Sequence, residues 1–308
     1  MFLLEPISKD YIWGGTLLKE RFGKAGEGAV VAESWELSTH PDGLTLLKGR
    51  EESLRCYLEN NPGAGGSCVA ESGETPILVK LIDAQKALSV QVHPDDAYAA
   101  KMGQRGKTEL WHILDAQPGA GIYLGVKEPI SREEFKRHIS ENTVEQILRW
   151  VPVKAGESYY IPAGTLHAIG AGCLIYEVQQ SSNLTYRVYD YGRLGADGKP
   201  RQLHIEDALA VSVLSYVDTA PLGKNEAEGI IADCPYFTLR ELTVEKDSEF
   251  TAPEDSFCHL LCTEGEVSAF QDGNCCVLAP GAGAFLNAGE EILLRGKGKI
   301  LAVSGKNS

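Results

Sequence analysis

The stretch Gly156-Glu157-Ser158-Tyr159-Tyr160-Ile161-Pro162-Ala163-Gly164-Thr165-Leu166-His167 decides the fold of this chain. It predicts a glycine turn, a short strand, a Pro-Ala-Gly turn and then a polar side chain. The stretch 281–289 repeats the order of glycine turn, strand and Ala-Gly turn, but it continues into two glutamates without a histidine. A repeated jelly-roll unit in which only the first copy carries polar ligands would have this pattern.

Most of the remaining chain consists of short candidate strands between turn residues, which predicts a mainly β fold. Candidate strands include residues 76–82 and 87–93. Residues 217–229 are polar and rich in turn formers, and strand patterns resume from residue 230. We therefore expect a first, catalytic domain over residues 1–229, a linker at its end, and a second β domain over residues 230–308.

Helix signals gather between residues 131 and 150. Ser131-x-x-Glu134 and Thr143-x-x-Gln146 both have the capping-box pattern, which predicts a small helical pair inserted in the β protein. We expect His138 on this insertion to face solvent. A further short helix is predicted over residues 205–213.

Composition and charge limit the classes of function. The 308 residues include 29 Lys and Arg against 43 Asp and Glu, a formal net charge of −14. This balance disfavours nucleic acids and anionic membranes as partners. The first residues lack the basic and apolar regions of a secretory signal, so we expect a reducing, cytoplasmic location. The eight cysteines lack zinc-finger spacing, and we expect them to be ordinary buried or half-buried residues.

Four residues form the strongest candidate site. In the strand 87–93, Leu88, Val90 and Val92 alternate with Ser89, Gln91 and His93, so the second set shares one face. Glu109 follows after a turn, and His167 follows the Pro-Ala-Gly turn. Two imidazoles, a carboxylate and an amide oxygen suit a divalent cation, with zinc first and manganese or iron open. We expect the remaining histidines to be core or surface residues: His40, His112, His138, His204 and His259.

Several motifs resemble one family. The turn pattern from Gly156 to His167 is similar to the second motif of the cupin superfamily, although Ala171 stands where that motif ends in Asn. Specific motifs over residues 1–215 resemble the short bacterial form of the type I mannose-6-phosphate isomerases: 13–15 (WGG), 33–38 (ESWELS), 87–95 (ALSVQVHPD), 106–109 (GKTE), 161–168 (IPAGTLHA) and 183–190 (NLTYRVYD). Thr108 departs from the proline of larger members.

This resemblance implies a cupin jelly-roll with a degenerate second β domain, and an enzyme that converts one sugar phosphate, mannose 6-phosphate, into fructose 6-phosphate through a cis-enediolate. It implies one zinc ion per chain. The implied ligands are Gln91, His93, Glu109 and His167, and the implied active-site residues are Arg187, Lys86, Ser89, Lys107 and Glu177.

Two assignments stay open at this level. The base could be Lys107, Glu177 or a zinc-bound hydroxide, and we favour the lysine or the zinc-bound species. The phosphate needs cations, for which Lys86, Lys107 and Arg193 are candidates, with Ser89 as a hydroxyl donor.

Three other functions fit the same residues. A cupin oxygenase with non-haem iron would also use two histidines and a carboxylate. An isomerase acting on another hexose phosphate shares the chemistry, and a non-enzymatic sugar- or metal-binding protein would bind without turnover. The oligomeric state is open.

Overall fold

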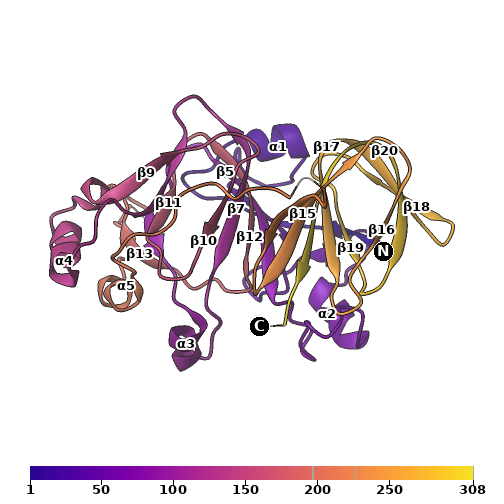
Figure 1. Cartoon of the computed structure of the whole chain (residues 1–308), viewed down its shortest axis with the longest axis horizontal. Helices are drawn as coiled ribbons and strands as arrows, with labels where there is room; N and C mark the ends of the chain where they lie inside the picture. Colours follow the sequence, from indigo (N-terminus) through magenta and orange to yellow (C-terminus); the bar gives the residue numbers. More distant parts are fainter. Residues whose placement is uncertain (196–197, 226, 308) are drawn as a thin grey trace.

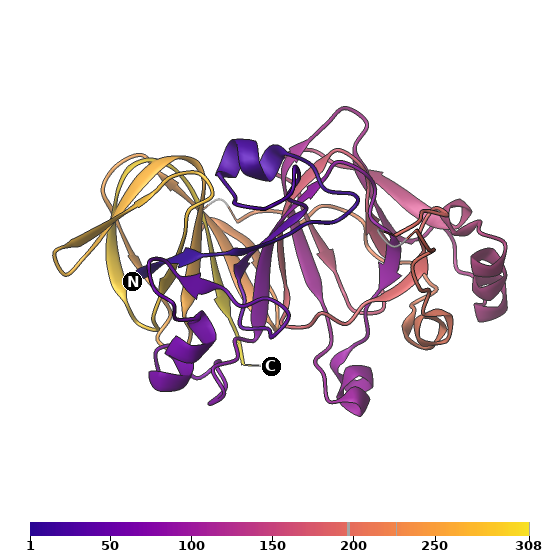
Figure 2. The same cartoon turned by 180° about the vertical axis from the view of Figure 1, so that it is seen from behind.

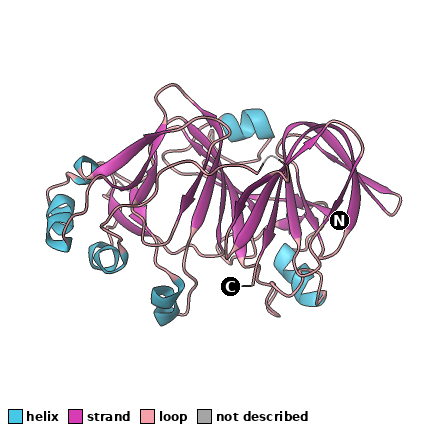
Figure 3. Ribbon diagram, viewed as in Figure 1, coloured by secondary structure: helices cyan, strands magenta, loops and turns pink. Residues whose placement is uncertain are grey.

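Two β lobes lie side by side in the computed structural model, which describes residues 1–195, 198–225 and 227–307 (Figure 1). Strands far outnumber helices (Figure 3), so the prediction of a mainly β fold is confirmed. The first lobe contains β2 (Ile7–Lys9), β3 (Glu33–Leu37), β5 (Ile77–Ala84), β6 (Val90–Val92), β7 (Glu109–Ala116), β8 (Gly121–Val126), β9 (Leu148–Pro152), β10 (Ser158–Ile161), β11 (His167–Ile169), β12 (Cys173–Gln180) and β13 (Tyr186–Tyr189). The second contains β1 (Phe2–Glu5), β4 (Leu46–Leu47), β14 (Ile230–Asp233), β15 (Phe237–Val244), β16 (Ser248–Thr251), β17 (Cys258–Gln271), β18 (Asn274–Leu278), β19 (Gly283–Leu286) and β20 (Glu291–Gly305).

The first lobe is built from two sheets packed face to face. One sheet has the order β10-β7-β12-β5-β3-β2, and the other has the order β13-β6-β11-β8-β9. Apolar side chains from both sheets fill the space between them, among them Ile82, Trp111, Ile122 and Ile175. The interior of this lobe is therefore enclosed by two sheets that approach each other across a shared core.

Short helices cover the outside of the lobes: α1 (Leu17–Phe22), α2 (Leu54–Asn60), α3 (Asp96–Ala99), α4 (Arg132–Ser140) and α5 (Ile205–Val211), with 3₁₀ turns η1 (Ala100–Met102) and η2 (Val144–Gln146). Val90 and Val92 on the outer face of β6 share a core with Phe135 of α4 and Leu209 of α5. The prediction that Leu88 shares this face with Val90 and Val92 is wrong. Leu88 precedes the strand and packs in the inner core. None of the helices in these ranges is long and apolar enough to cross a membrane.

The second lobe recruits the start of the chain. Its main sheet runs β14-β15-β20-β17-β19-β1-β4, so β1 pairs with β19 from the other end of the sequence (Figure 2). One continuous core joins Val79 and Tyr176 of the first lobe to Phe237 and Phe285 of the second. The predicted boundary at residue 229 stays a prediction, but hydrogen bonds and apolar packing both cross it.

The pattern repeated in residues 156–164 and 281–289 corresponds to two similar strand-and-turn units in the structure. Stretch 156–164 contains β10, and stretch 281–289 contains β19. Both strands lie between two glycines with positive φ, namely Gly156 (+88°) and Gly164 (+84°) in the first copy and Gly281 (+84°) and Gly289 (+70°) in the second. These left-handed positions explain why glycine recurs at the same points of both copies.

Of the two helices predicted in the insertion, only the first forms as an α-helix. Ser131 caps α4 by accepting a hydrogen bond from the Glu134 amide at 3.1 Å. The second predicted helix is wrong, because only η2 forms and β9 already begins at Leu148. The hydroxyl of Thr143 pairs with Nδ1 of His138 at 2.8 Å and caps no helix. His138 is therefore buried, not solvated as predicted.

The cysteines are all unpaired thiols. Six of them are buried or half-buried as expected, whereas Cys56 and Cys275 are exposed. Cys56 lies on α2 at the surface, and Cys275 lies on β18, which with the end of β17 forms a hairpin that extends from the second lobe (Figure 1).

Candidate metal centre and active-site cavity

The two sheets of the first lobe bring the predicted ligands together. Gln91 lies on β6, and His93 follows the same strand. His167 begins β11, where it is the register partner of Gln91. Glu109 begins β7 in the facing sheet. The centre therefore depends on both sheets, and no single strand contains it.

The turn before His167 is tied to the other histidine strand. The amide of Gly164 donates a hydrogen bond to the carbonyl oxygen of His93 at 2.8 Å. Gly164 has a φ of +84°, and a Cβ at this position would lie 2.9 Å from the Val211 carbonyl oxygen. Glycine is required here by both backbone conformation and space.

Three of the ligand side chains converge on one point. Nε2 of His93 lies 3.3 Å from Oε1 of Glu109, and Nε2 of His167 lies 3.4 Å from its Oε2. The ligand atoms of these three residues all lie within 4.8 Å of one another, and all three side chains are buried. Among the described residues, no other group of three or more His, Cys, Asp and Glu side chains is placed to hold a metal ion.

Backbone carbonyls orient both imidazoles. Nδ1 of His93 lies 2.9 Å from the Leu184 oxygen, and Nδ1 of His167 lies 2.8 Å from the Thr165 oxygen. Each carbonyl accepts the Nδ1 proton, which leaves the Nε2 lone pair directed at the centre. Burial, reinforced by the nearby Lys107, lowers the pKa of His93 to about 3, and burial also lowers the pKa of His167.

The carboxylate of Glu109 is buried and pairs with a lysine, but no donor among the described residues meets it with hydrogen-bond geometry. Burial alone would raise the pKa of Glu109, but the charge of Lys107 and the adjacent His93 hold that pKa well below its usual range. Lys107 Nζ forms an ion pair with Oε1 at 2.7 Å. Within the described residues, neither oxygen of Glu109 nor Nε2 of His167 has a partner with hydrogen-bond geometry. Buried polar atoms without partners are costly, so this donor set fits a bound cation.

A cavity of about 270 Å³ reaches Gln91 and Lys107, whereas His93, Glu109 and His167 are outside its described wall. Five of the predicted site residues line it: Ser89, Gln91, Lys107, Glu177 and Arg187. Arg187 is the register partner of Gln91 on the neighbouring strand β13, and its Nε donates to the Ser89 hydroxyl at 3.1 Å. The arginine therefore lies next to a candidate metal ligand, Gln91, in the same sheet.

Glu177 faces the cavity from β12. Its Oε2 accepts a hydrogen bond from the Trp111 indole at 2.8 Å, and its Oε1 lies 3.3 Å from Nζ of Lys80. Burial and the nearby charge of Glu109 raise the pKa of Glu177. The ring of Trp111 also meets His167 edge to face at 5.4 Å between centroids. Glu177 is thus held by its neighbours and forms part of the cavity wall.

Two of the three predicted substrate-binding residues are not brought into the cavity. Lys86 is exposed in the loop after β5 and is absent from the described cavity wall. Arg193 is likewise outside that wall and donates to the Ala87 carbonyl oxygen at 2.6 Å.

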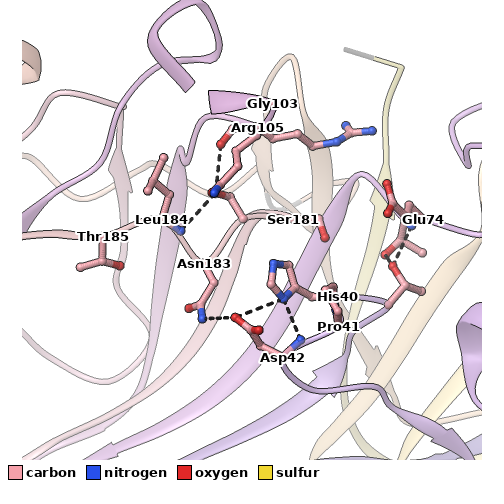
Figure 4. A pocket seen from close by; sticks show the side chains of 14 residues that line it. His40, Pro41, Asp42, Glu74, Gly103, Arg105, Ser181, Asn183, Leu184 and Thr185 are labelled. Atoms are coloured by element: carbon pink, nitrogen blue, oxygen red, sulfur yellow. Dashed lines mark hydrogen bonds and ion pairs between the residues drawn. The ribbon is translucent and has the colours of Figure 1, made fainter. Parts of the chain in front are cut away.

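A second polar pocket has a volume of about 590 Å³ (Figure 4). Asn183 and Thr185 line both pockets. Asn183 is fixed by Asp42, whose carboxylate accepts a hydrogen bond from its amide at 2.7 Å. The segment 183–185 is therefore the wall between the two pockets and also supplies the Leu184 carbonyl that orients His93.

Comparison with known proteins identifies the family. A family model for the catalytic domain of type I phosphomannose isomerase matches residues 1–115. The mannose-6-phosphate isomerase of Streptococcus mutans is 38% identical over 248 residues, covering 78% of this chain and 77% of that protein. The mannose-6-phosphate isomerase ManA of Bacillus subtilis is 33% identical over 91% of this chain and 93% of that protein. The chain belongs to the type I mannose-6-phosphate isomerase family.

Solved structures of mannose-6-phosphate isomerases agree with this assignment. The crystal structure of the Bacillus subtilis enzyme has a TM-score of 0.90 and 32% identity, covering 98% of each chain. The expectations of a cupin fold and of an aldose-ketose isomerase are confirmed by these likenesses.

Lys80 is a cavity residue that the motifs of the sequence did not indicate. Lys80 is the register partner of Glu177 on β5, and its Nζ also lies 3.6 Å from Glu33. Burial opposes the charge of Lys80, but the carboxylates of Glu33 and Glu177 raise its pKa. A signal existed, since a lysine within the apolar run 77–82 is rarely buried without a charged partner. Other unpredicted cavity residues are Tyr11, Trp13, Asn183, Thr185 and Arg201.

Proposed function

We propose that this isomerase interconverts mannose 6-phosphate and fructose 6-phosphate with one zinc ion held by Gln91, His93, Glu109 and His167. The observation that carries the proposal is the set of buried atoms of Glu109 and His167 without hydrogen-bond partners, beside Lys107, which lines a cavity that also holds other cations. Two imidazole nitrogens and two oxygens suit zinc. A solved mannose 6-phosphate isomerase, 21% identical with a TM-score of 0.80, is described as bound with zinc and yttrium.

The reaction moves a proton between two neighbouring carbons of the open-chain sugar. Removal of the C2 proton of the aldose gives a cis-enediolate, with negative charge on the former carbonyl oxygen. Return of the proton to C1, with transfer of the hydroxyl proton from O2 to O1, gives the ketose. A bound zinc ion supplies a Lewis acid that stabilises this negative charge. A base and a second cation must come from the chain.

We assign the base to Lys107. Its Nζ borders the cavity next to the metal ligands, at 2.7 Å from Glu109 and 3.3 Å from Nε2 of His93. In its amine form Lys107 accepts the C2 proton and returns it to C1. Glu177 is a weaker candidate because Trp111 and Lys80 already occupy its two oxygens.

Arg187 supplies the second cation. Its guanidinium is fixed by Ser89 on one side and donates from Nη1 to the Gln202 carbonyl oxygen at 3.1 Å on the other. A fixed guanidinium beside the metal centre binds sugar oxygens and developing charge without reorganisation during the reaction.

A coupled assay of fructose 6-phosphate formation tests the function. We expect activity in the metallated protein, loss after chelation and recovery with zinc. His167→Ala should lose both the metal and the activity, whereas His40→Ala, outside this cavity, should retain both. Iron in the purified protein together with oxygen consumption would indicate an oxygenase instead. Binding of mannose 6-phosphate without turnover in the fully metallated protein would indicate a binding protein.

Solvent proton exchange tests the base. In deuterated water, Lys107→Met should lose exchange at C2 while its zinc content, measured by mass spectrometry, stays at one per chain. Lys48→Met is the matched control because Lys48 is exposed and outside the site. Normal exchange in Lys107→Met would remove this lysine from the proton-transfer step.

A further inference from the structure

The turn that leads into β7 contains a threonine, Thr108, where larger members of the family have proline. Thr108 is 3% exposed and lies between Lys107, which lines the cavity, and the candidate ligand Glu109. Its amide donates a hydrogen bond to Oε1 of Gln180 at 2.9 Å. A proline has no amide hydrogen and could not form this bond. The threonine therefore has a partner that a proline in its place would lose.

Gln180 continues the pairing of β7 with β12 beyond the last register pair, Glu109 with Gln179. The Gln180 amide donates to the Thr108 carbonyl oxygen at 3.1 Å. In an antiparallel pair the return bond would go to the Gln180 carbonyl oxygen, but that oxygen accepts from Nε2 of Gln179 at 3.0 Å. The Gln180 side chain takes its place as the acceptor. Two hydrogen bonds thus hold Thr108 to β12 directly before Glu109.

The other end of the Gln180 carboxamide is engaged as well. Its Nε2 lies 3.1 Å from each oxygen of the Asp96 carboxylate. Oδ1 of Asp96 also accepts a hydrogen bond from the amide of Gly106 at 2.8 Å. Gly106 approaches so closely that a Cβ on it would lie 2.5 Å from the Asp96 amide nitrogen. The turn 106–108 is therefore held at its start by Asp96 and at its end by Gln180.

The hydroxyl of Thr108 reaches the Pro-Ala-Gly turn. Its Oγ1 accepts a hydrogen bond from the amide of Ala163 at 3.3 Å. Thr108 therefore links the strand that begins with Glu109, in one sheet, to the turn that leads to His167, in the other sheet. Neither Thr108 nor Gln180 belongs to the described wall of the cavity. They are therefore placed to act through the metal ligands and not on the substrate.

The ligand atoms at this centre depend on the surrounding chain to keep them together. Both oxygens of Glu109 and Nε2 of His167 are buried without hydrogen-bond partners among the described residues, an arrangement that is costly until a cation binds. We propose that Thr108 and Gln180 are positioning residues, which hold Glu109 and the turn before His167 in the geometry that binds the metal. The inference rests on the proposed function, since it concerns the ligands assigned there.

Zinc affinity tests each link, measured on the metal-free full chain by competition with a chromophoric chelator. Gln180→Met keeps the length of the side chain and removes its acceptor and donors, so we expect zinc to bind about tenfold or more weakly. Thr108→Val keeps the shape and the backbone amide but removes the hydroxyl, with an expected loss of about tenfold. Thr108→Ser keeps the hydroxyl and should bind zinc within about twofold of wild type.

Thr45→Val is the matched control for a purely structural effect. Thr45 is 0% exposed, and its hydroxyl accepts a hydrogen bond from the Ser38 amide at 3.0 Å, outside the site. Urea unfolding of the metal-free proteins should show losses of unfolding free energy in both Thr45→Val and Thr108→Val. Only Thr108→Val should lose zinc affinity. An equal loss of zinc affinity in Thr45→Val would reduce the effect to general stability and overturn the positioning role of Thr108.

Unchanged zinc affinity in a folded Thr108→Val or Gln180→Met protein, with the circular dichroism spectrum of wild type, would overturn the role of that residue. The proposed function can fail separately from this inference. If both variants bind zinc more weakly but the wild-type protein does not isomerise mannose 6-phosphate, the function is contradicted and the positioning role is supported.

Discussion

A buried ion pair where the two lobes meet offers the sharpest test of the packing. Lys24 Nζ lies 2.7 Å from Oε2 of Glu36, and their side chains are 4% and 1% exposed. The same ammonium donates to the Gly281 carbonyl oxygen of the second lobe at 2.6 Å. The other oxygen of Glu36 has no hydrogen-bond partner within the described residues. Lys24 is therefore the main compensation for a carboxylate that water cannot reach.

Lys24→Met keeps the length of the side chain and removes its charge. It leaves a buried carboxylate unpaired, which costs about 3 to 5 kcal/mol of unfolding free energy. The double variant Lys24→Met/Glu36→Met removes both charges, and apolar replacements of buried pairs are often neutral or stabilising. We therefore expect the double variant to be more stable than Lys24→Met alone, by at least about 2 kcal/mol.

Urea unfolding followed by fluorescence and circular dichroism measures these differences, provided the two transitions coincide. The exposed pair of Arg21 and Asp115, 2.6 Å apart, is the matched control. Arg21→Met should change the unfolding free energy by less than about 1 kcal/mol, because exposed pairs contribute little. A Lys24→Met protein as stable as the Arg21→Met control, or a double variant less stable than Lys24→Met, would refute the reasoning.

Three further predictions follow from buried groups and the shared core. His259 is 0% exposed, and neither of its ring nitrogens has a hydrogen-bond partner in the described part of the chain. His259→Leu should therefore raise the unfolding free energy by about 1 kcal/mol, as measured with urea. A destabilised variant would show that the imidazole has a partner. Burial lowers the pKa of His112 from 6.5 to about 4, so its contribution to stability is full above pH 6.5 and is lost as the pH falls from there towards 4. Between pH 7 and pH 4.5, the unfolding free energy measured with urea should therefore decrease less in His112→Asn than in the wild type, by up to about 3 kcal/mol. An equal decrease in both proteins would exclude His112 as its source. A fragment ending at Gly229 leaves β1 without its partner β19 and exposes the core shared by the lobes, so we expect aggregation on size-exclusion chromatography, whereas a monomeric, active fragment would contradict a structural role of the second lobe.

The candidate metal centre could be predicted from the sequence because its residues belong to local patterns. Gln91 and His93 are two residues apart, so they share one face of a strand, and His167 follows a recognisable Pro-Ala-Gly turn. The second helix of the insertion was not predictable in the same way. Thr143 and Gln146 have a capping pattern, but the Thr143 hydroxyl is hydrogen-bonded to His138. From Leu148 onward the chain forms β9, which pairs with β8. Tertiary partners outweighed a local signal there.

The sequence by itself determined the β class, the paired glycine turns and the family, and it predicted the candidate ligand set, because each depends on short-range spacing and residue type. Only the tertiary structure decided which cations face the cavity. Lys80 enters because β5 pairs with β12 opposite Glu177, and Arg201 enters because Asp190 holds it, whereas Lys86 stays exposed. Side chains distant in sequence become partners through strand register and charge pairing, and neither can be read from the spacing of residues along the chain.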